Sequence, residues 1–316
     1  MNNTVSTARE RVVIVMPVYD DWLSLAKLVE NLNALLGSAG HITERFDFCL
    51  LAVDDAPHRL QAAPNLPISG NVVVQKLSLQ RNMGHQRAIA IGLAHALVHL
   101  SAQYMIVMDA DGEDNPSDIP RLIDACSSAQ DTFVVFAERT KRGESLSFRG
   151  GYLIYRWLHH ILTGHRIRFG NYSIIPAKLA AMVVKSSYVW SHYAAAIVKL
   201  KLPYRLIPTQ RGRRYFGHSS MSFSSLIAHG LTSMVLFYET VSVRLTMAFA
   251  LFSLTGLSLT AWQLANGFSL LLLLGAIASL WVTGMILVLF QIFILLQSKT
   301  QVEIMPAKDA ATFCQD

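Results

Sequence analysis

Acidic residues are missing from the middle of this chain of 316 residues. No Asp or Glu occurs from Ser145 to Tyr238, although the same stretch contains 12 Lys and Arg residues. A long segment whose charged residues are all basic favours anionic partners. It also contains no carboxylate that could act as a general base. Phosphates and lipid headgroups are favoured over nucleic acid, because an apolar region follows directly.

Charge is also scarce overall, at 15% of residues against 52% hydrophobic ones, which is unusual for a soluble protein. Leu245 to Leu264 and Phe268 to Leu296 contain no charged residue. Each reaches the roughly 20 residues that cross a bilayer, and only Ala265 to Gly267 separates them. We predict a transmembrane hairpin over residues 245–297. Two buried core helices are the alternative, but the second segment is too long and lacks a polar face.

The loop between the two apolar segments carries no charge, so the flanking cations predict the orientation. These are Arg211, Arg213, Arg214 and Arg244 before the hairpin, and Lys299 and Lys308 after it. The positive-inside rule then predicts a multi-pass protein of the inner (cytoplasmic) membrane, with both ends in the cytoplasm. No signal peptide is expected, because the first apolar run, Val12 to Val18, is short and contains Pro17.

The chain contains only three cysteines, an odd number. Cys49, Cys126 and Cys314 are scattered and match neither a metal-binding spacing nor a disulfide framework. This usage suits a reducing cytoplasm.

Apolar runs alternate with helical patterns through the first part of the chain. Strands are predicted at Arg11–Tyr19, Phe46–Val53, Asn71–Leu77, Tyr104–Met108 and Thr132–Ala137. Helices are predicted at Trp22–Leu36, from Asn82–Gly84 through His99, and at Asp118–Ala125. This alternation predicts an α/β fold with a doubly wound, mostly parallel sheet.

Three of the predicted strands end in acidic residues. The three ends are Tyr19-Asp20-Asp21, Asp54-Asp55 and Asp109-Ala110-Asp111. Open α/β sheets bind ligands at the carboxyl ends of their strands, so the three ends should converge on one edge.

The third acidic end contains four carboxylates between Asp109 and Asp114. Such a group repels itself unless a cation joins it, and hard oxygen ligands suit Mg²⁺ or Mn²⁺. A metal of this kind binds substrate phosphates beside one or two carboxylates, which favours a diphosphate ligand. A solvated acidic turn that caps the next helix is the alternative for this segment alone.

Five segments in order resemble family-2 inverting glycosyltransferases with a GT-A fold, over nearly the whole chain. They are PVYDD at 17–21, VDD at 53–55, RNMGHQRAIAIGLAHA at 81–96, DADGEDNP at 109–116 and RGRRYFGHSSMSF at 211–223. More narrowly, the set resembles polyprenyl-phosphate glycosyltransferases, which include dolichyl-phosphate mannose synthases and bacterial undecaprenyl-phosphate sugar transferases.

The resemblance implies a binding site for a nucleoside diphosphate sugar, and we expect a uridine-based one. Pro17, Tyr19 and Asp55 would line the nucleotide, with Asp54 beside it. Asp21 stands where the family usually has Glu.

The resemblance also implies the groups that act on phosphates. Asp109, Ala110 and Asp111 would meet the diphosphate, with Asp111 as the principal ligand of Mg²⁺ or Mn²⁺. Glu113 stands where the family commonly has a metal-contacting Gln. The residues implied in catalysis are Asp109, Asp111, Arg139 and Arg214, since the two arginines match phosphate-holding arginines.

Three departures from the family pattern concern the substrates. Ser220 replaces a Lys, Asn171 replaces an Asp, and Ala56-Pro57 replaces Gly-Ser after Asp55. They leave open the donor sugar and the acceptor.

The lack of acid after Ser145 bears on the acceptor. A hydroxyl acceptor usually needs a base, whereas a phosphate monoester, with a second pKa of about 6, is already ionised. The arginine-rich half therefore favours polyprenyl phosphate as acceptor. Two alternatives stay open: a transferase to a lipid or glycan hydroxyl with His192 as base, and a non-catalytic membrane partner that binds nucleotide sugar.

The predicted organisation follows from these segments. Residues 1–220 form a cytoplasmic GT-A domain, 221–244 a juxtamembrane amphipathic helix, 245–297 the hairpin and 298–316 a cytoplasmic tail. The sequence leaves homo-oligomerisation open and gives no sign of nucleic acid as a partner.

Overall fold

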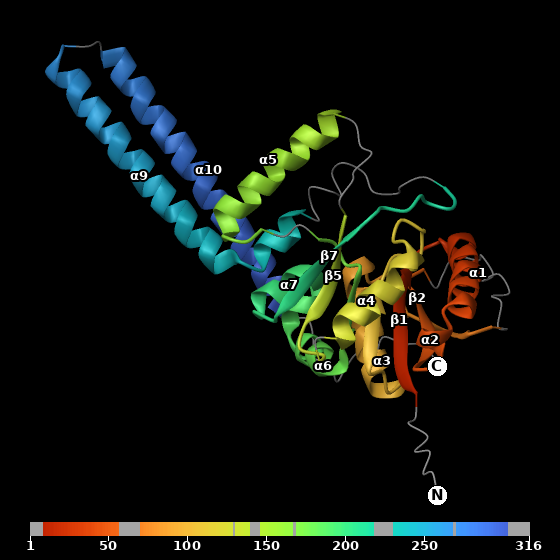
Figure 1. Ribbon diagram of the computed structural model, residues 1–316. Coiled ribbons are helices and arrows are strands. Elements are labelled where there is room, and N and C mark those ends of the chain that lie inside the picture. The colour runs from red at the N-terminus through yellow and green to blue at the C-terminus, as the bar shows by residue number, and fades with distance from the viewer. Residues whose placement is uncertain are drawn as a thin grey trace, which may run out of the picture. The chain divides into compact units, whose positions relative to one another are not determined.

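The computed structural model describes residues 9–56, 70–128, 130–139, 146–166, 169–217, 230–267 and 270–302 (Figure 1). The chain divides into two compact units. Unit 1 comprises Met1–Ser145, Ile167–Ser222 and Ile304–Asp316, and unit 2 comprises Leu146–Arg166 and Phe223–Glu303. The predicted boundaries at residues 220 and 297 stay predictions.

Unit 1 alternates strands and helices along the chain. Its strands are β1 (Glu10–Val18), β2 (Phe46–Asp54), β3 (Val72–Ser78), β4 (Tyr104–Val107), β5 (Val134–Arg139), β6 (Ser173–Pro176) and β7 (Tyr204–Thr209). Its helices are α1 (Trp22–Ser38), α2 (Gly40–Thr43), α3 (His85–His99), η1 (Pro116–Asp118), α4 (Ile119–Ser127), α6 (Ala177–Lys185), η2 (Ser187–Trp190) and α7 (Tyr193–Lys199). The predicted strands and helices of the first part of the chain are confirmed to within a few residues.

The seven strands form one sheet in the order β3-β2-β1-β4-β6-β5-β7. Neighbouring strands are parallel except for β6, which runs antiparallel to both β4 and β5. The predicted mostly parallel sheet is therefore confirmed. Every strand but β6 ends at the same edge of the sheet, here called the carboxyl edge, and β6 begins there.

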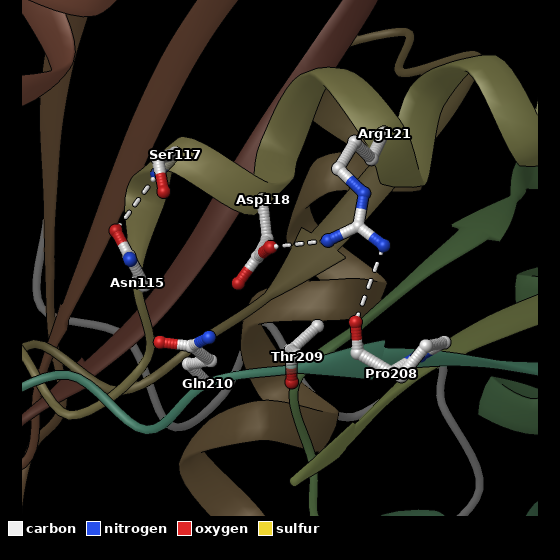
Figure 2. A pocket seen from close by; sticks show the side chains of 7 residues that line it. All are labelled: Asn115, Ser117, Asp118, Arg121, Pro208, Thr209 and Gln210. Carbon is white, nitrogen blue, oxygen red and sulfur yellow. Dashed lines mark hydrogen bonds and ion pairs between the residues drawn. The ribbon is translucent and has the colours of Figure 1, made fainter. Parts of the chain in front are cut away.

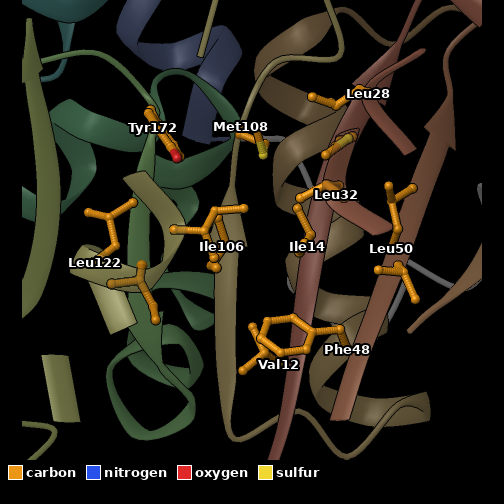
Figure 3. Close-up of a cluster of buried hydrophobic side chains, with 14 of the residues drawn as sticks. Val12, Ile14, Leu28, Leu32, Phe48, Leu50, Ile106, Met108, Leu122 and Tyr172 are labelled. Atoms are coloured by element: carbon orange, nitrogen blue, oxygen red, sulfur yellow. The ribbon is translucent and has the colours of Figure 1, made fainter. Parts of the chain in front are cut away.

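Apolar side chains from α1 and α4 cover one face of this sheet (Figure 3). Leu28 and Leu32 of α1 and Leu122 of α4 pack with Ile14 of β1 and Ile106 of β4, all fully buried. Each such side chain contributes roughly 1.5–3 kcal/mol by leaving water.

Helix α3 packs closely against the sheet because it contains Gly92. A Cβ atom at this position would lie 2.4 Å from a methyl carbon of Val15 and 2.8 Å from one of Val53. This close packing sets the height of α3 above β1 and β2, and so the place of the helix start, His85, near the carboxyl edge.

The described residues of unit 2 include the helices α5 (Leu146–Thr163), α9 (Tyr238–Ala265) and α10 (Leu270–Val302). Helices α9 and α10 contact each other, and the Gln291 side-chain amide donates to the Thr246 hydroxyl at 2.9 Å. In the described part of the chain, α9 alone is long and apolar enough to cross a membrane, whereas α10 contains a shorter apolar stretch, Ile277–Ile292. Two membrane-spanning helices were predicted, and among the described residues one helix, α9, meets the length and apolarity of a span. The predicted hairpin, residues 245–297, falls on α9 and α10 and stays a prediction.

Candidate active site

The acidic ends of β1, β2 and β4 lie side by side because the three strands are parallel neighbours. Val18 at the end of β1 is opposite Asp54, and the Asp55 amide donates to the Val18 carbonyl at 2.9 Å. On the other side of β1, the Met108 amide donates to the Val15 carbonyl at 3.2 Å. Each acidic segment therefore starts at the carboxyl edge, as the sequence predicts.

Asp55 binds the backbone at the start of α3. Its two carboxylate oxygens accept from the amides of Met83 at 2.5 Å and Gly84 at 2.8 Å. Burial raises the pKa of Asp55, and the two amides oppose that rise. Its neighbour Asp54 is buried and pairs with Lys76 at 2.9 Å. Asp55 thus orders the loop before α3, and Asp54 links β2 to β3, both beside the predicted nucleotide site.

Arg214 joins the other carboxylates of the edge. Its Nη2 lies 2.5 Å from an Asp111 oxygen, its Nη1 3.8 Å from Asp21, and its Nε 3.9 Å from Glu113. Burial is the main cause that raises the pKa of Asp111 and of Asp21, while the Arg214 charge lowers both. One guanidinium therefore serves three carboxylates from two motifs, Asp21 of segment 17–21 and Asp111 and Glu113 of segment 109–116.

Backbone pairing explains why Arg214 reaches this place. The Gly212 amide donates to the Glu113 carbonyl at 2.8 Å, and the Tyr215 amide donates to the Asp111 carbonyl at 2.9 Å. The two segments touch closely, since a Cβ atom on Gly212 would lie 2.3 Å from the Gly112 carbonyl oxygen. Residues 211–215 are thereby bound to the acidic segment 111–113.

The remaining residues of the third acidic end point in different directions. Asp109 lies 3.4 Å from His85 Nε2, and Glu113 forms a salt bridge with Arg211. Ala110 is buried in the apolar cluster below the edge, so only its backbone can meet a ligand.

Three further predicted residues are placed by their strands. Pro17 is opposite Val53 within the sheet, and Tyr19 follows β1 with 44% of its surface exposed. Arg139 ends β5 opposite Thr209, and its side chain lies outside the described residues.

The carboxylates at the carboxyl edge are candidate ligands for a divalent metal. Among the residues the structure describes, no three His, Cys, Asp or Glu side chains gather as a metal site, so Asp109, Asp111 and Glu113 do not form one alone. Asp109 and Asp111 nevertheless supply oxygen ligands at the edge, and Mg²⁺ or Mn²⁺ typically needs only one or two carboxylates when phosphates complete the site. The residues fit a metal that arrives with a diphosphate.

A cavity of about 370 Å³ adjoins the acidic segment (Figure 2). It is lined by Asn115, Ser117, Asp118, Arg121, Pro208, Thr209 and Gln210. Arg121 crosses it, paired with Asp118 at 3.0 Å and with the Pro208 carbonyl at 3.2 Å. None of the predicted site residues lines this cavity.

His192, the base considered for a hydroxyl acceptor, is buried at the start of α7. Its Nδ1 accepts from the Ala195 amide at 3.3 Å and so caps that helix. The imidazole thus has a structural task.

The sequence does not identify Lys76 and Arg211 as partners of the acidic ends. Lys76 lies inside β3, where no sequence signal links it to Asp54. Arg211 stands in the basic motif, but its pairing with Glu113 depends on β7 ending at the same edge as β4.

Comparison with known proteins relates this site to one family. The sequence profile described as "Glycosyl transferase family 2" matches residues 13–188, more than half of the chain. Undecaprenyl-phosphate 4-deoxy-4-formamido-L-arabinose transferase of Salmonella paratyphi A is 26% identical over 90% of this chain and 82% of its own length. The protein of that name from Erwinia tasmaniensis is 28% identical over 84% and 76%.

Among solved structures, glucosyl-3-phosphoglycerate synthase from Mycobacterium tuberculosis, in complex with Mn²⁺, UDP-glucose and phosphoglyceric acid, superposes with a TM-score of 0.51. It is 12% identical and covers 74% of this chain and 80% of its own, which shows a shared fold. From the family profile, the mostly parallel sheet and the acidic carboxyl edge, the chain belongs to the family-2 glycosyltransferases and has their GT-A fold.

Proposed function

We propose that the chain transfers a sugar from a nucleoside diphosphate, a uridine-based one, to polyprenyl phosphate at the cytoplasmic face of a membrane, with inversion at the sugar carbon. The names of the relatives that match most of the chain support an undecaprenyl phosphate acceptor. The fold relative that was solved with UDP-glucose supports the donor class.

The observation that carries the proposal is the position of Arg214. Its guanidinium lies at the carboxyl edge against Asp111 and Asp21, and it comes from the part of the chain without acids. A planar guanidinium binds phosphate oxygens in pairs, which supports a role for Arg214 in holding a phosphate at the acidic edge. A phosphate acceptor would replace the carboxylates as its partner.

Asp109 and Asp111 would hold the divalent metal, with Asp111 as the principal ligand. A bound metal neutralises charge on the departing diphosphate. The chain itself supplies the orientation: Asp55 orders the loop before α3, and the pairing of residues 211–215 with 111–113 keeps Arg214 beside Asp111.

Proton transfer supports the same acceptor. Residues 145–238 offer no carboxylate, and the His192 ring nitrogen Nδ1 already accepts from the Ala195 amide. A lipid phosphate needs no base because it is ionised near neutral pH. Helix α9, with α10 beside it, would keep the enzyme at the membrane where this lipid resides.

The test is sugar transfer by the full chain in membranes. Membranes are incubated with radiolabelled nucleotide sugars and undecaprenyl phosphate, and the lipid products are identified by mass spectrometry. A sugar phosphate lipid that mild acid cleaves is expected. An acid-stable glycolipid would instead indicate a hydroxyl acceptor.

The matched control separates catalysis from binding. Asp111→Asn should abolish transfer at normal expression, whereas Asp47→Asn, an exposed carboxylate on β2, should leave transfer unchanged. Full complementation in cells by Asp111→Asn would indicate a non-catalytic partner.

A further inference from the structure

The antiparallel strand β6 brings one more residue to the carboxyl edge. Val107 of β4 is opposite Ser173 of β6, so the residues that follow β4 lie beside those that precede β6. Asn171 therefore stands next to Asp109, although 61 residues separate them in the sequence. Its neighbour across the edge is His85, the first residue of α3.

His85 and Asn171 form a polar pair beside Asp109. The Asn171 amide nitrogen lies 3.1 Å from His85 Nε2, which in turn lies 3.4 Å from Asp109. His85 keeps 44% of its side chain exposed, so the pair is open to a ligand.

The pair leaves hydrogen-bonding capacity unused. The Asn171 side-chain oxygen is buried, and it has no hydrogen-bond partner among the residues the structure describes. The same holds for the side-chain nitrogen of Gln86, a residue 9% exposed whose oxygen accepts from the Tyr193 amide at 2.7 Å. Buried polar atoms are nearly always paired in native proteins, so the Asn171 oxygen has an acceptor position available for a group that binds beside it.

The backbone around Asn171 is held in place. The Ser173 hydroxyl donates to the Asn171 carbonyl at 2.9 Å, and the Tyr172 hydroxyl donates to the Asn115 carbonyl at 2.8 Å. A side chain on such a fixed backbone loses little freedom on binding, as recognition sites require.

The chemistry of the pair favours a neutral hydroxyl. An amide and an imidazole can each donate and accept, which matches a hydroxyl group. Neither side chain carries a permanent positive charge that would bind an anion. Along the edge the strand order is β2-β1-β4-β6, so a ligand with its nucleotide over β1 and β2 and its diphosphate at β4 carries its sugar toward β6.

We propose that His85 and Asn171 hydrogen-bond a hydroxyl group of the donor sugar and so help to select which sugar is transferred. This inference rests on the proposed function, because it takes the diphosphate to lie at Asp109 and Asp111. A site built to bond a substrate hydroxyl discriminates strongly against an analogue that lacks it.

The test compares His85→Ala and Asn171→Ala with the unmodified full chain in membranes or detergent. The donors are UDP-glucose, UDP-galactose, UDP-N-acetylglucosamine and GDP-mannose, followed by single-deoxy analogues of the best one. We expect each variant to lower kcat/KM for the best donor by about 10- to 100-fold. For the analogue that lacks the recognised hydroxyl, variants and unmodified protein should be equal.

Two readouts separate sugar recognition from a structural role. Binding of UDP alone, measured by calorimetry, should be unchanged in both variants. His85→Gln, which keeps a donor and an acceptor, should restore part of kcat/KM. His99→Ala, at the other end of α3, is the control and should match the unmodified protein.

The outcomes that overturn the inference are distinct from those that overturn the proposed function. The pair does not recognise the sugar if UDP binding weakens as much as sugar transfer. The same conclusion follows if the variants discriminate against every deoxy analogue as strongly as the unmodified protein does. If the unmodified protein transfers sugar from no donor, the proposed function falls, and this inference falls with it.

Discussion

At the scale of single residues, the same side chain performs different tasks at the carboxyl edge according to its partners. Asp55 accepts from two backbone amides and orders a loop, whereas Asp111 accepts from Arg214 and the Glu113 amide and stays at the ligand edge. Both are buried, and burial raises the pKa of each. The partners, and not the residue type, separate the carboxylate that orders a loop from the one that we propose as a metal ligand.

Asp55→Asn should destabilise unit 1. An asparagine places its own N–H group against the amide of Met83 or Gly84, so one buried amide loses its acceptor, at a cost of about 1–3 kcal/mol. Thermal unfolding in detergent measures the change. Asp47→Asn, exposed on the same strand, serves as control, and equal melting temperatures for the two variants would contradict the prediction.

Arg214→Lys should lower activity without loss of the fold. A lysine keeps the charge but cannot reach three carboxylates or bind a phosphate in two places, and we expect kcat/KM to fall roughly 10- to 100-fold. Arg213→Lys, at the exposed neighbouring position, should have little effect. Similar kinetics for both variants would show that Arg214 contributes charge alone.

At the scale of elements, the direction of the strands brings the candidate site residues together. Strand β7 ends at the same edge as β4, and the chain after it pairs with the acidic segment through the amides of Gly212 and Tyr215. Segments 111–113 and 211–215, about 100 residues apart in the sequence, are thus hydrogen-bonded to each other. They meet because the strands that precede them, β4 and β7, run in the same direction.

Gly212→Ala should disturb this pairing. The added Cβ would lie 2.3 Å from the Gly112 carbonyl, so residues 211–215 must move away from Asp111. A displacement of this kind can lower the rate by roughly 100-fold. Transfer assays and circular dichroism would measure it, with Gly40→Ala in open space as control. Normal turnover would show that the contact is not needed.

Unit 2 should be sensitive to acid through α5. Burial lowers the pKa of His159, whose ring lies near Thr163 and the His165 carbonyl. The unfolded segment then binds a proton below about pH 6.5 while the folded one resists it, so stability is present above that pH and is lost as the pH falls.

Hydrogen exchange of amides 155–163 tests this. Protection, corrected for intrinsic rates, should fall between pH 7.5 and about 5.5 in the unmodified chain and much less in His159→Gln. The exposed His41→Gln should behave like the unmodified chain. Equal pH dependence in all three proteins would exclude His159 as the cause.

At the scale of the whole molecule, the chain combines a catalytic fold with apolar helices. Helix α9 is long enough to span a bilayer, and α10 lies beside it. With the hairpin proposed here, Asn266 would face the side of the membrane opposite the active site. The enzyme would then meet its lipid acceptor where the lipid resides.

Cysteine labelling tests this topology. In sealed vesicles that contain the chain with Cys314→Ser, Asn266→Cys should react with an impermeant maleimide from one side, and Arg213→Cys from the other. The two remaining native cysteines, Cys49 and Cys126, are buried. Reaction of both positions from the same side would show that α9 and α10 do not form a hairpin across the membrane.

The sequence by itself determined the class of fold, the acidic ends of β1, β2 and β4, and the apolar helices, because each follows from local periodicity or from adjacent residues. It also indicated the family through ordered motifs. The bounds of the strands and helices in the first part of the chain were confirmed because propensity and burial agree there.

The tertiary structure alone decided which residues meet. The reversal of β6 puts Asn171 beside Asp109 and His85, and the parallel end of β7 puts Arg214 on Asp111. These contacts join segments that are far apart in the chain, and they depend on strand order and direction. A single sequence carries no local signal for either, because each is set by how the helices pack on the two faces of the sheet.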